Sequence, residues 1–273
     1  VYSKQWQNFV LYHRNQTDRP LDFRHPEAEQ YHRQTDAGTS ISIMEFLKYI
    51  YAHDRFRQSE RYGIRALPTD NRNLAYKAAE VIKERYDIPG GVFIELKKTI
   101  PVAAGLAGGS ADCAAVLYAM NILYNLKIKR EELAAIALEL GSDVPYCLMR
   151  GTALAEGIGE RLSVLPSMPK CTILIAKPGI SVSTKFVYEN LHANDLKPEQ
   201  HPDVDRMIEA MKEKNLDLLC ERMGNVLETV TIPAYPVIQE IKEHMMACGA
   251  AGAMMSGSGP TVFGIFHSPV QAK

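Results

Sequence analysis

The sequence predicts an α/β protein made of two domains. Its 273 residues are enough for two hydrophobic cores around one cleft. From residue 68 onward, stretches with the periodicity of amphipathic helices alternate with short apolar runs typical of strands. The stretch Leu165-Pro-Ser-Met-Pro169 has the composition of a linker. We therefore expect domains at residues 1–165 and 166–273.

The helix and strand signals follow one another along most of the chain. In the first domain, Asp70 and Asn71 are candidate N-caps, and Gly141 is a candidate helix stop. The predicted elements of this domain are a helix over 72–86, a strand over 92–97 and helices over 111–126 and 129–140. Those of the second domain are a strand over 171–177, helices over 203–214, 216–227 and 236–248, and two strands around a glycine-rich turn within 254–266.

Composition excludes several classes of protein. A formal net charge of −1 with 46% hydrophobic residues argues against a binder of nucleic acid or another polyanion. No apolar run has membrane-spanning length, and the first residues lack the apolar core of a signal peptide, so we expect a cytoplasmic protein without membrane partners. The 5 cysteines and 8 histidines lack metal-ligand spacing. We therefore expect reduced cysteines and no zinc site.

The most informative stretch is the loop Pro101-Val-Ala-Ala-Gly-Leu-Ala-Gly-Gly-Ser-Ala111, which precedes a predicted helix. Its small residues let the backbone approach a ligand closely, and a helix start offers unpaired N–H groups and the positive end of the helix dipole. This favours an anion site, most simply one for phosphate. The glycine spacing matches neither a Walker A loop nor Gly-x-Gly-x-x-Gly. Local pattern alone leaves open an ordinary glycine-rich loop capped by Ser110.

The loop resembles the phosphate loop of the GHMP small-molecule kinases, Pro-x-x-x-Gly-Leu-Gly/Ala-Ser/Gly-Ser/Gly-Ser/Ala. Other stretches between about residues 68 and 266 resemble the branch of that family that phosphorylates the 2-hydroxyl of 4-diphosphocytidyl-2-C-methyl-D-erythritol, in the non-mevalonate isoprenoid pathway. They are Asn73-Leu-Ala75, Lys98-Thr-Ile-Pro101, Gly141-Ser-Asp-Val-Pro145, Ala155-Glu-Gly-Ile-Gly-Glu160, Lys177-Pro-Gly-Ile-Ser-Val-Ser-Thr184 and Met255-Ser-Gly-Ser-Gly-Pro260. The resemblance implies an α+β, two-domain GHMP kinase fold. Its N-terminal domain would be like domain 2 of ribosomal protein S5, its C-terminal domain would be ferredoxin-like, and the active site would lie between them.

The resemblance also implies an ATP site. In the family the loop cradles the phosphates, while an asparagine at a helix start and a lysine before the loop contact the nucleotide. The residues implied here are Asn73, Lys98, Pro101, Val102, Ala103, Ala104, Gly105, Leu106, Ala107, Gly108, Gly109, Ser110 and Ala111. Locally, Asn73 is equally typical of a polar residue at a helix start, and Lys98 of a solvated lysine at a strand end.

Asp143 lies in the turn where this family places its catalytic aspartate. A carboxylate within reach of an alcohol can accept its proton as the oxygen attacks the γ-phosphorus. Loop amides, a lysine and Mg²⁺ then neutralise the charge on the transferring group. The resemblance thus implies ATP and Mg²⁺ as cofactors, with Asp143 as base and substrate contact. Judged locally, Asp143 would be a simple helix cap.

Thr184 and Tyr188 are one helical turn apart and would face the same way. The resemblance implies that they lie beside the cytosine end of the substrate, whereas the local alternative is a core-facing pair. Gly257, Ser258 and Gly259 could close over the substrate or the phosphates, or they could form only a tight hairpin.

Residues 1–67 depart from the family pattern. Arginine outnumbers lysine there, the reverse of the rest of the chain, and only a short apolar patch at 41–50 interrupts an irregular sequence. The family's opening Ala-Lys-Ile-Asn strand and Gly-Tyr-His segment are missing, and neither Lys4, Lys48 nor Tyr31-His32 replaces them. We expect this segment to be mis-assigned or out of frame, since one-nucleotide shifts permit family-like text. The alternative is a divergent N-terminal strand pair.

The predicted activity is that of a small-molecule kinase whose substrate is cytidine diphosphate methylerythritol. We expect a monomer or weak homodimer with no nucleic-acid partner. Another GHMP kinase, acting on homoserine, mevalonate or a sugar, is a first alternative. The second is an inactive nucleotide-binding homologue, because the missing N-terminal lysine strand would remove a second catalytic contact.

Overall fold

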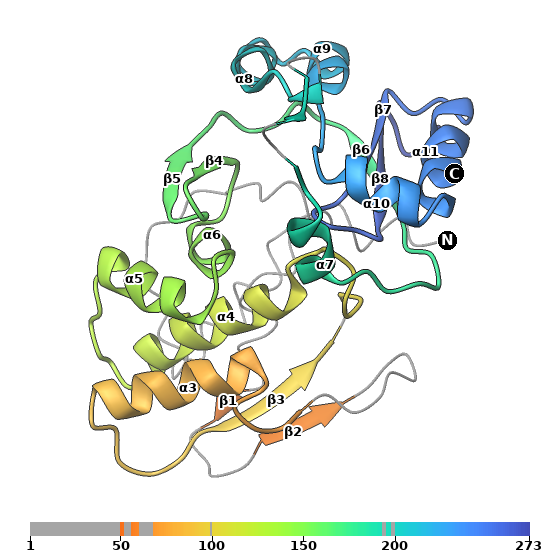
Figure 1. The fold of residues 1–273 in the computed structure, drawn as a ribbon. Coiled ribbons are helices and arrows are strands. Elements are labelled where there is room, and N and C mark those ends of the chain that lie inside the picture. The colour runs from red at the N-terminus through yellow and green to blue at the C-terminus, as the bar shows by residue number, and fades with distance from the viewer. Residues whose placement is uncertain (1–49, 52–55, 60–67, 99, 193–194, 198–199) are drawn as a thin grey trace. The chain divides into compact units, whose positions relative to one another are not determined.

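The structure, a computed structural model, describes residues 50–51, 56–59, 68–98, 100–192, 195–197 and 200–273 (Figure 1). They form two compact units. The N-terminal unit contains the described residues between 50 and 102 together with residues 107–164. The C-terminal unit contains residues 103–106 and the described residues from 165 onward. The middle of the predicted phosphate loop therefore belongs to a different unit from its two ends.

The N-terminal unit has a small mixed sheet with β3 in the centre. The described strands of this sheet are β1 (Ile50–Tyr51), β2 (Phe56–Ser59) and β3 (Phe93–Lys97). Strand β1 pairs with β3 antiparallel, with Ile50 opposite Ile94. Strand β2 pairs with the other edge of β3 in parallel, with Phe56 opposite the same Ile94. Two short parts of the atypical opening segment are thus strands. Lys4, Tyr31, His32 and Lys48 lie outside the described residues, and the reading-frame hypothesis stays a prediction.

Helices and a hairpin complete the N-terminal unit. They are α3 (Leu74–Arg85), α4 (Gly108–Leu123), α5 (Arg130–Leu140), α6 (Val144–Met149), β4 (Ala153–Glu156) and β5 (Arg161–Val164). The three helices predicted for this domain are confirmed, with shifted ends. The predicted caps Asp70 and Asn71 are wrong, because the oxygen of the Asn73 side chain accepts the hydrogen bond from the Ala75 N–H at 3.0 Å. Asp70 instead pairs with the Arg72 guanidinium at 2.8 Å.

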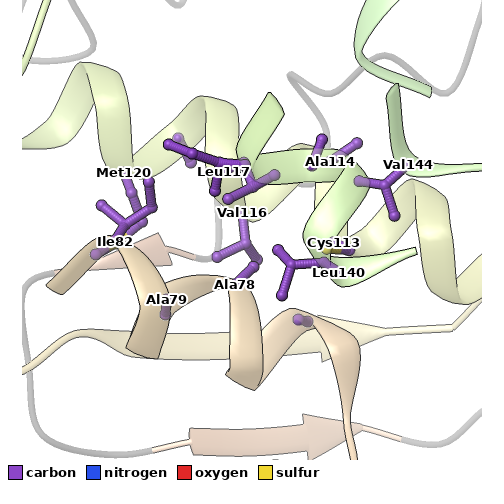
Figure 2. Close-up of a cluster of buried hydrophobic side chains, with 14 of the residues drawn as sticks. Ala78, Ala79, Ile82, Cys113, Ala114, Val116, Leu117, Met120, Leu140 and Val144 are labelled. Carbon is purple, nitrogen blue, oxygen red and sulfur yellow. The ribbon is translucent and has the colours of Figure 1, made fainter. Parts of the chain in front are cut away.

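The core of this unit is built around α4 (Figure 2). Ala78 and Ile82 of α3 belong to one buried cluster with Val116 and Met120 of α4, and all four have no exposed surface. Helix α4 contacts α3, α5 and α6, which explains its nearly continuous apolar sequence. Alanines on both α3 and α4 let the two backbones approach closely, so the packing leaves little room for larger side chains.

The C-terminal unit is an antiparallel sheet in the order β6-β8-β7, with helices around it. The strands are β6 (Thr172–Ala176), β7 (Gly252–Met255) and β8 (Val262–Phe266). The helices are α7 (Thr184–Glu189), α8 (Val204–Glu213), α9 (Leu216–Arg222), α10 (Glu228–Ala234) and α11 (Val237–Ala247). The predicted helix over 216–227 ends early at Arg222, and α10 was not predicted. Asn225 starts a new turn by accepting the Leu227 N–H at 3.0 Å.

Both faces of the C-terminal sheet are covered, and every residue of β8 is buried. Val262 and Phe266 belong to the same cluster as Ile238 of α11, whereas Phe263 and Ile265 belong to a second cluster on the other face. This alternation follows from the two-residue period of a strand. It explains why β8 is apolar throughout.

The cysteines are free thiols, and Cys113, Cys147 and Cys220 are buried. Burial raises the pKa of Cys113 and of Cys147 to about 12, which keeps both protonated at neutral pH. Within the described ranges, no helix combines the length and apolar character needed to cross a bilayer.

Ala78→Leu tests the tight packing between α3 and α4. Overpacking of a full core should lower the free energy of unfolding by about 1–3 kcal/mol. The control is Ala135→Leu, at an exposed position of α5, which should change it by less than about 0.5 kcal/mol. Urea unfolding of both variants measures the difference, and equal stabilities would contradict the packing described here.

Candidate active site

Helix α4 starts inside the predicted phosphate loop, at Gly108, so Gly109 and Ser110 lie in its first turn. Ala107 occupies the N-cap position with a left-handed φ of 48°, and no side chain caps the helix there. The local alternative in which Ser110 caps the helix is therefore wrong. A helix start without a side-chain cap can offer its first N–H groups and the positive end of its dipole to an anion.

The first half of the loop is held by a turn of the C-terminal unit. Gly105 has a φ of +69°, and a Cβ atom on it would lie 2.4 Å from the Ser256 carbonyl oxygen. The Ser256 hydroxyl donates a hydrogen bond to the Gly105 carbonyl oxygen at 2.8 Å. No L side chain fits at position 105 without moving backbone. The fold itself therefore requires glycine at position 105, whether or not a ligand binds to the loop.

The turn that contacts Gly105 spans residues 256–261 and joins β7 to β8, so the hairpin interpretation is confirmed. The Asn225 side-chain amide donates to the carbonyl oxygens of Met255, at 3.0 Å, and Gly257, at 2.8 Å. Sequence reasoning missed Asn225, since no local pattern marks a side chain that supports a distant turn. Its two hydrogen bonds support the start of the turn, on either side of Ser256.

Thr184 is linked to the same turn. Its hydroxyl lies 2.9 Å from the Ser258 hydroxyl, so contacts within the C-terminal unit connect Thr184 through the turn to Gly105. Thr184 is exposed, and Tyr188 is 61% exposed. The alternative of a core-facing pair is wrong, because Val187 is the buried residue of α7. Thr184 and Tyr188 are therefore available to a ligand.

Lys98 is not the solvated lysine of the local alternative. It is buried, and its ammonium group forms an ion pair with the Asp112 carboxylate on α4. A Cβ atom on Gly108 would lie 3.3 Å from the Lys98 Nζ atom, which places the ammonium group beside the start of α4. Sequence reasoning missed Asp112. Its signal was available, because it is the sole charged residue between Ala111 and Leu126.

Asn73 acts first as the N-cap of α3, so the interpretation as a polar residue at a helix start is confirmed. Its side-chain amide also donates to the Pro68 carbonyl oxygen at 3.0 Å. Leu74 Cδ1 would lie 3.8 Å from a Cβ atom on Gly109, so the start of α3 lies beside the first turn of α4. The nucleotide contact of Asn73 stays a prediction.

Asp143 occupies the N-cap position of α6 but makes no capping hydrogen bond, which contradicts the local alternative. Its exposed carboxylate makes no hydrogen bond or ion pair with any other residue that the structure describes. The β4–β5 hairpin packs closely on the same turn, since a Cβ atom on Gly159 would lie 3.0 Å from the Ser142 carbonyl oxygen. The turn is held while the carboxylate is left free to accept a proton.

The N-terminal unit thus combines a helix start without a side-chain cap, a buried cation beside it and a free carboxylate. Helix α6 packs on α4. Burial raises the pKa of the Cys147 thiol in α6 to about 12, and the charges of Asp143 and Asp112 act in the same direction. Among the described residues, no group of His, Cys, Asp and Glu side chains could hold a metal ion by itself. The helix start, the buried cation and the free carboxylate suit the binding of a phosphoryl group and its transfer to an alcohol.

Two family models match the chain. The model described as the GHMP kinases N terminal domain matches residues 73–151, and that described as GHMP kinases C terminal matches residues 207–273. Both matches lie after residue 68, where the sequence shows regular helix and strand patterns. Together they include Asn73, Lys98, the loop and Asp143.

Relatives named 4-diphosphocytidyl-2-C-methyl-D-erythritol kinase match over most of the chain. The one from Lachnospira eligens is 59% identical over 73% of this chain and 69% of its own length. The one from Exiguobacterium sibiricum is 48% identical over 90% of this chain and 84% of its own. A crystal structure titled as 4-(cytidine 5'-diphospho)-2C-methyl-D-erythritol kinase matches with a TM-score of 0.67 and 36% identity, over 82% of this chain and 77% of that one.

Substitution of two loop glycines by alanine should have opposite effects on stability. Gly105→Ala should lower the free energy of unfolding by more than about 1 kcal/mol, because its φ is positive and backbone atoms occupy the Cβ position. Gly109→Ala should raise it by about 0.4–1 kcal/mol, because the nearest described atom is an ordinary 3.8 Å contact. Thermal and urea unfolding of both variants measure this. Equal losses at both positions would contradict the contact between Gly105 and the turn.

Proposed function

The chain belongs to the GHMP kinase family, and from this premise we propose that it transfers the terminal phosphoryl group of ATP to the 2-hydroxyl of 4-diphosphocytidyl-2-C-methyl-D-erythritol. The acceptor in this proposal is the compound that the names of the relatives described above specify. The observation that carries the proposal is the α4 start without a side-chain cap in the same unit as the free Asp143 carboxylate. Phosphoryl transfer needs both, an anion cradle and a group that accepts the alcohol proton.

The phosphates of ATP bind in this proposal to loop residues 101–111. The N–H groups of Gly108, Gly109 and Ser110 point along the α4 axis toward the anion, and the Lys98 ammonium adds positive charge beside them. The developing charge on the transferring group is then stabilised by donors that are already in place. Asn73, at the neighbouring start of α3, is the proposed contact to the rest of the nucleotide.

Asp143 is the proposed general base. Its carboxylate is exposed and unpaired with other described residues, and the turn that carries it is supported by the β4–β5 hairpin. It would accept the proton of the acceptor hydroxyl as that oxygen forms its bond to the γ-phosphorus. Thr184 and Tyr188 are proposed to contact the cytosine end, since both are exposed and Thr184 is positioned through Ser258.

Mg²⁺ is the proposed metal cofactor. It prefers oxygen ligands and is usually held by substrate phosphates with one or two carboxylates. The donor set fits such a use, because the described side chains form no closed metal cage that would compete with a metal ion bound to ATP. When bound, Mg²⁺ would neutralise charge on the phosphates. The residues of this chain would orient the nucleotide and hold the acceptor proton.

Removal of the Asp143 charge should abolish most turnover. Asp143→Asn should lower kcat by about 10²-fold or more, the usual scale for loss of a general base, with little change in thermal stability. The matched control is Asp205→Asn, an exposed aspartate in the first turn of α8, which should leave kcat unchanged. Steady-state assays of both variants decide this, and full activity of Asp143→Asn would remove Asp143 from the mechanism.

A substrate panel separates the proposed function from its alternatives. We expect ATP-dependent phosphorylation of 4-diphosphocytidyl-2-C-methyl-D-erythritol and no turnover of homoserine, mevalonate or a sugar. Isothermal titration with ATP on the same preparation gives the second readout. Activity on another alcohol alone would overturn the assigned acceptor. ATP binding without turnover of any acceptor would favour the inactive homologue.

A further inference from the structure

The two ends of the phosphate loop are joined by a buried ion pair. Lys98 directly follows β3 and precedes the loop, and Asp112 follows it on α4. Their side chains are 9% and 15% exposed. The pair therefore closes the loop at its base, within the N-terminal unit.

Stability alone does not explain this pair. Removing two charges from water costs several kcal/mol per ion, and their mutual attraction offsets this cost only when the geometry is good. Well-packed apolar residues of similar size stabilise such a position at least as well. Burial accordingly raises the pKa of the Asp112 carboxyl, while the Lys98 ammonium acts in the opposite direction. A buried pair at this position calls for a role beyond packing.

The geometry relates the pair to the anion site. Gly108 and Asp112 are four residues apart on α4 and so share one face of the helix. The Lys98 Nζ atom lies against this face, 3.3 Å from the Cβ position of Gly108. A lysine side chain has four rotatable methylenes and would otherwise sample many positions. Asp112 restricts the ammonium group to the position beside the first turn of α4.

We propose that Asp112 is a positioning residue for nucleotide binding, acting through Lys98. It holds the ammonium group beside Gly108, so that an anion at the start of α4 would meet both this charge and the unpaired N–H groups of the first turn. Asp112 itself is bound to Lys98 and does not contact the reacting atoms. The inference rests on the proposed function, because it requires the loop to bind the phosphates of ATP.

The test is a double-mutant cycle at Lys98 and Asp112, measured on the whole chain. The variants are Lys98→Met, Asp112→Leu, Asp112→Asn and the double variant Lys98→Met/Asp112→Leu, which replaces both charges by apolar groups. Glu139→Gln is the control, since it breaks the exposed 2.8 Å pair between Arg85 and Glu139 in the same unit. Isothermal titration gives Kd for ATP, and thermal unfolding gives Tm.

We expect Lys98→Met and Asp112→Leu each to weaken ATP binding about tenfold or more, on the scale of a charge-assisted hydrogen bond lost in a buried site. Asp112→Asn keeps a hydrogen-bond acceptor for Lys98 and should lose less. The double variant should regain the Tm of the wild-type chain but keep the weak ATP binding of Lys98→Met. Glu139→Gln should change neither quantity.

Two outcomes would overturn the inference. The first is a double variant that binds ATP as tightly as wild type, since the pair would then be structural only. The second is a further loss of ATP affinity when Asp112→Leu is added to Lys98→Met, since Asp112 would then not act through Lys98. Failure of the wild-type chain to bind ATP would instead overturn the proposed function, so the two failures are distinguishable. The double variant keeps the test valid even if one single variant fails to fold.

Discussion

The contact between the Gly105 backbone and the 256–261 turn is the constraint on which the candidate site depends. It leaves no space for a side chain at position 105, and it fixes the chain before it enters the left-handed conformation at Ala107. Helix α4 then begins at Gly108, where a Cβ atom would lie 2.8 Å from the Ile100 side chain. The start of α4 is thus flanked by two close approaches, that of the turn backbone at Gly105 and that of the Ile100 side chain at Gly108. The helix lacks a side-chain cap because its N-cap residue is Ala107, whose side chain has no polar atom.

Two aspartates of the N-terminal unit illustrate how environment assigns roles to identical side chains. Asp112 is buried and is paired with Lys98, so it can orient that cation but is shielded from a substrate. Asp143 is exposed at the start of a short helix that it does not cap, so its carboxylate is free. The different roles that we propose for them follow from their different burial and partners.

Much of this organisation could be predicted from sequence. Helical periodicity located α3, α5, α8 and α11 because each buries one apolar face, and the glycines of the loop indicated a close backbone approach. Cap positions were harder, since Asp70 has the right side chain but is drawn to Arg72, leaving Asn73 to cap α3. The pairing of Lys98 with Asp112 and the support of the turn by Asn225 could not be predicted, because both join residues that only tertiary packing brings together. The local interpretation of Thr184 and Tyr188 as a core-facing pair was also wrong, because tertiary packing determines which face of α7 is exposed.

Residues 103–106 belong to the C-terminal unit although the chain on either side of them belongs to the N-terminal unit. The described chain thus passes from one unit to the other three times. Two of these three crossings flank the short stretch 103–106. A chimaera made by joining gene halves of two homologues near residue 165 would pair the hairpin turn of one parent with the Gly105 segment of the other. Recombination within this fold is therefore constrained, because the segment and the turn that receives it must be inherited together.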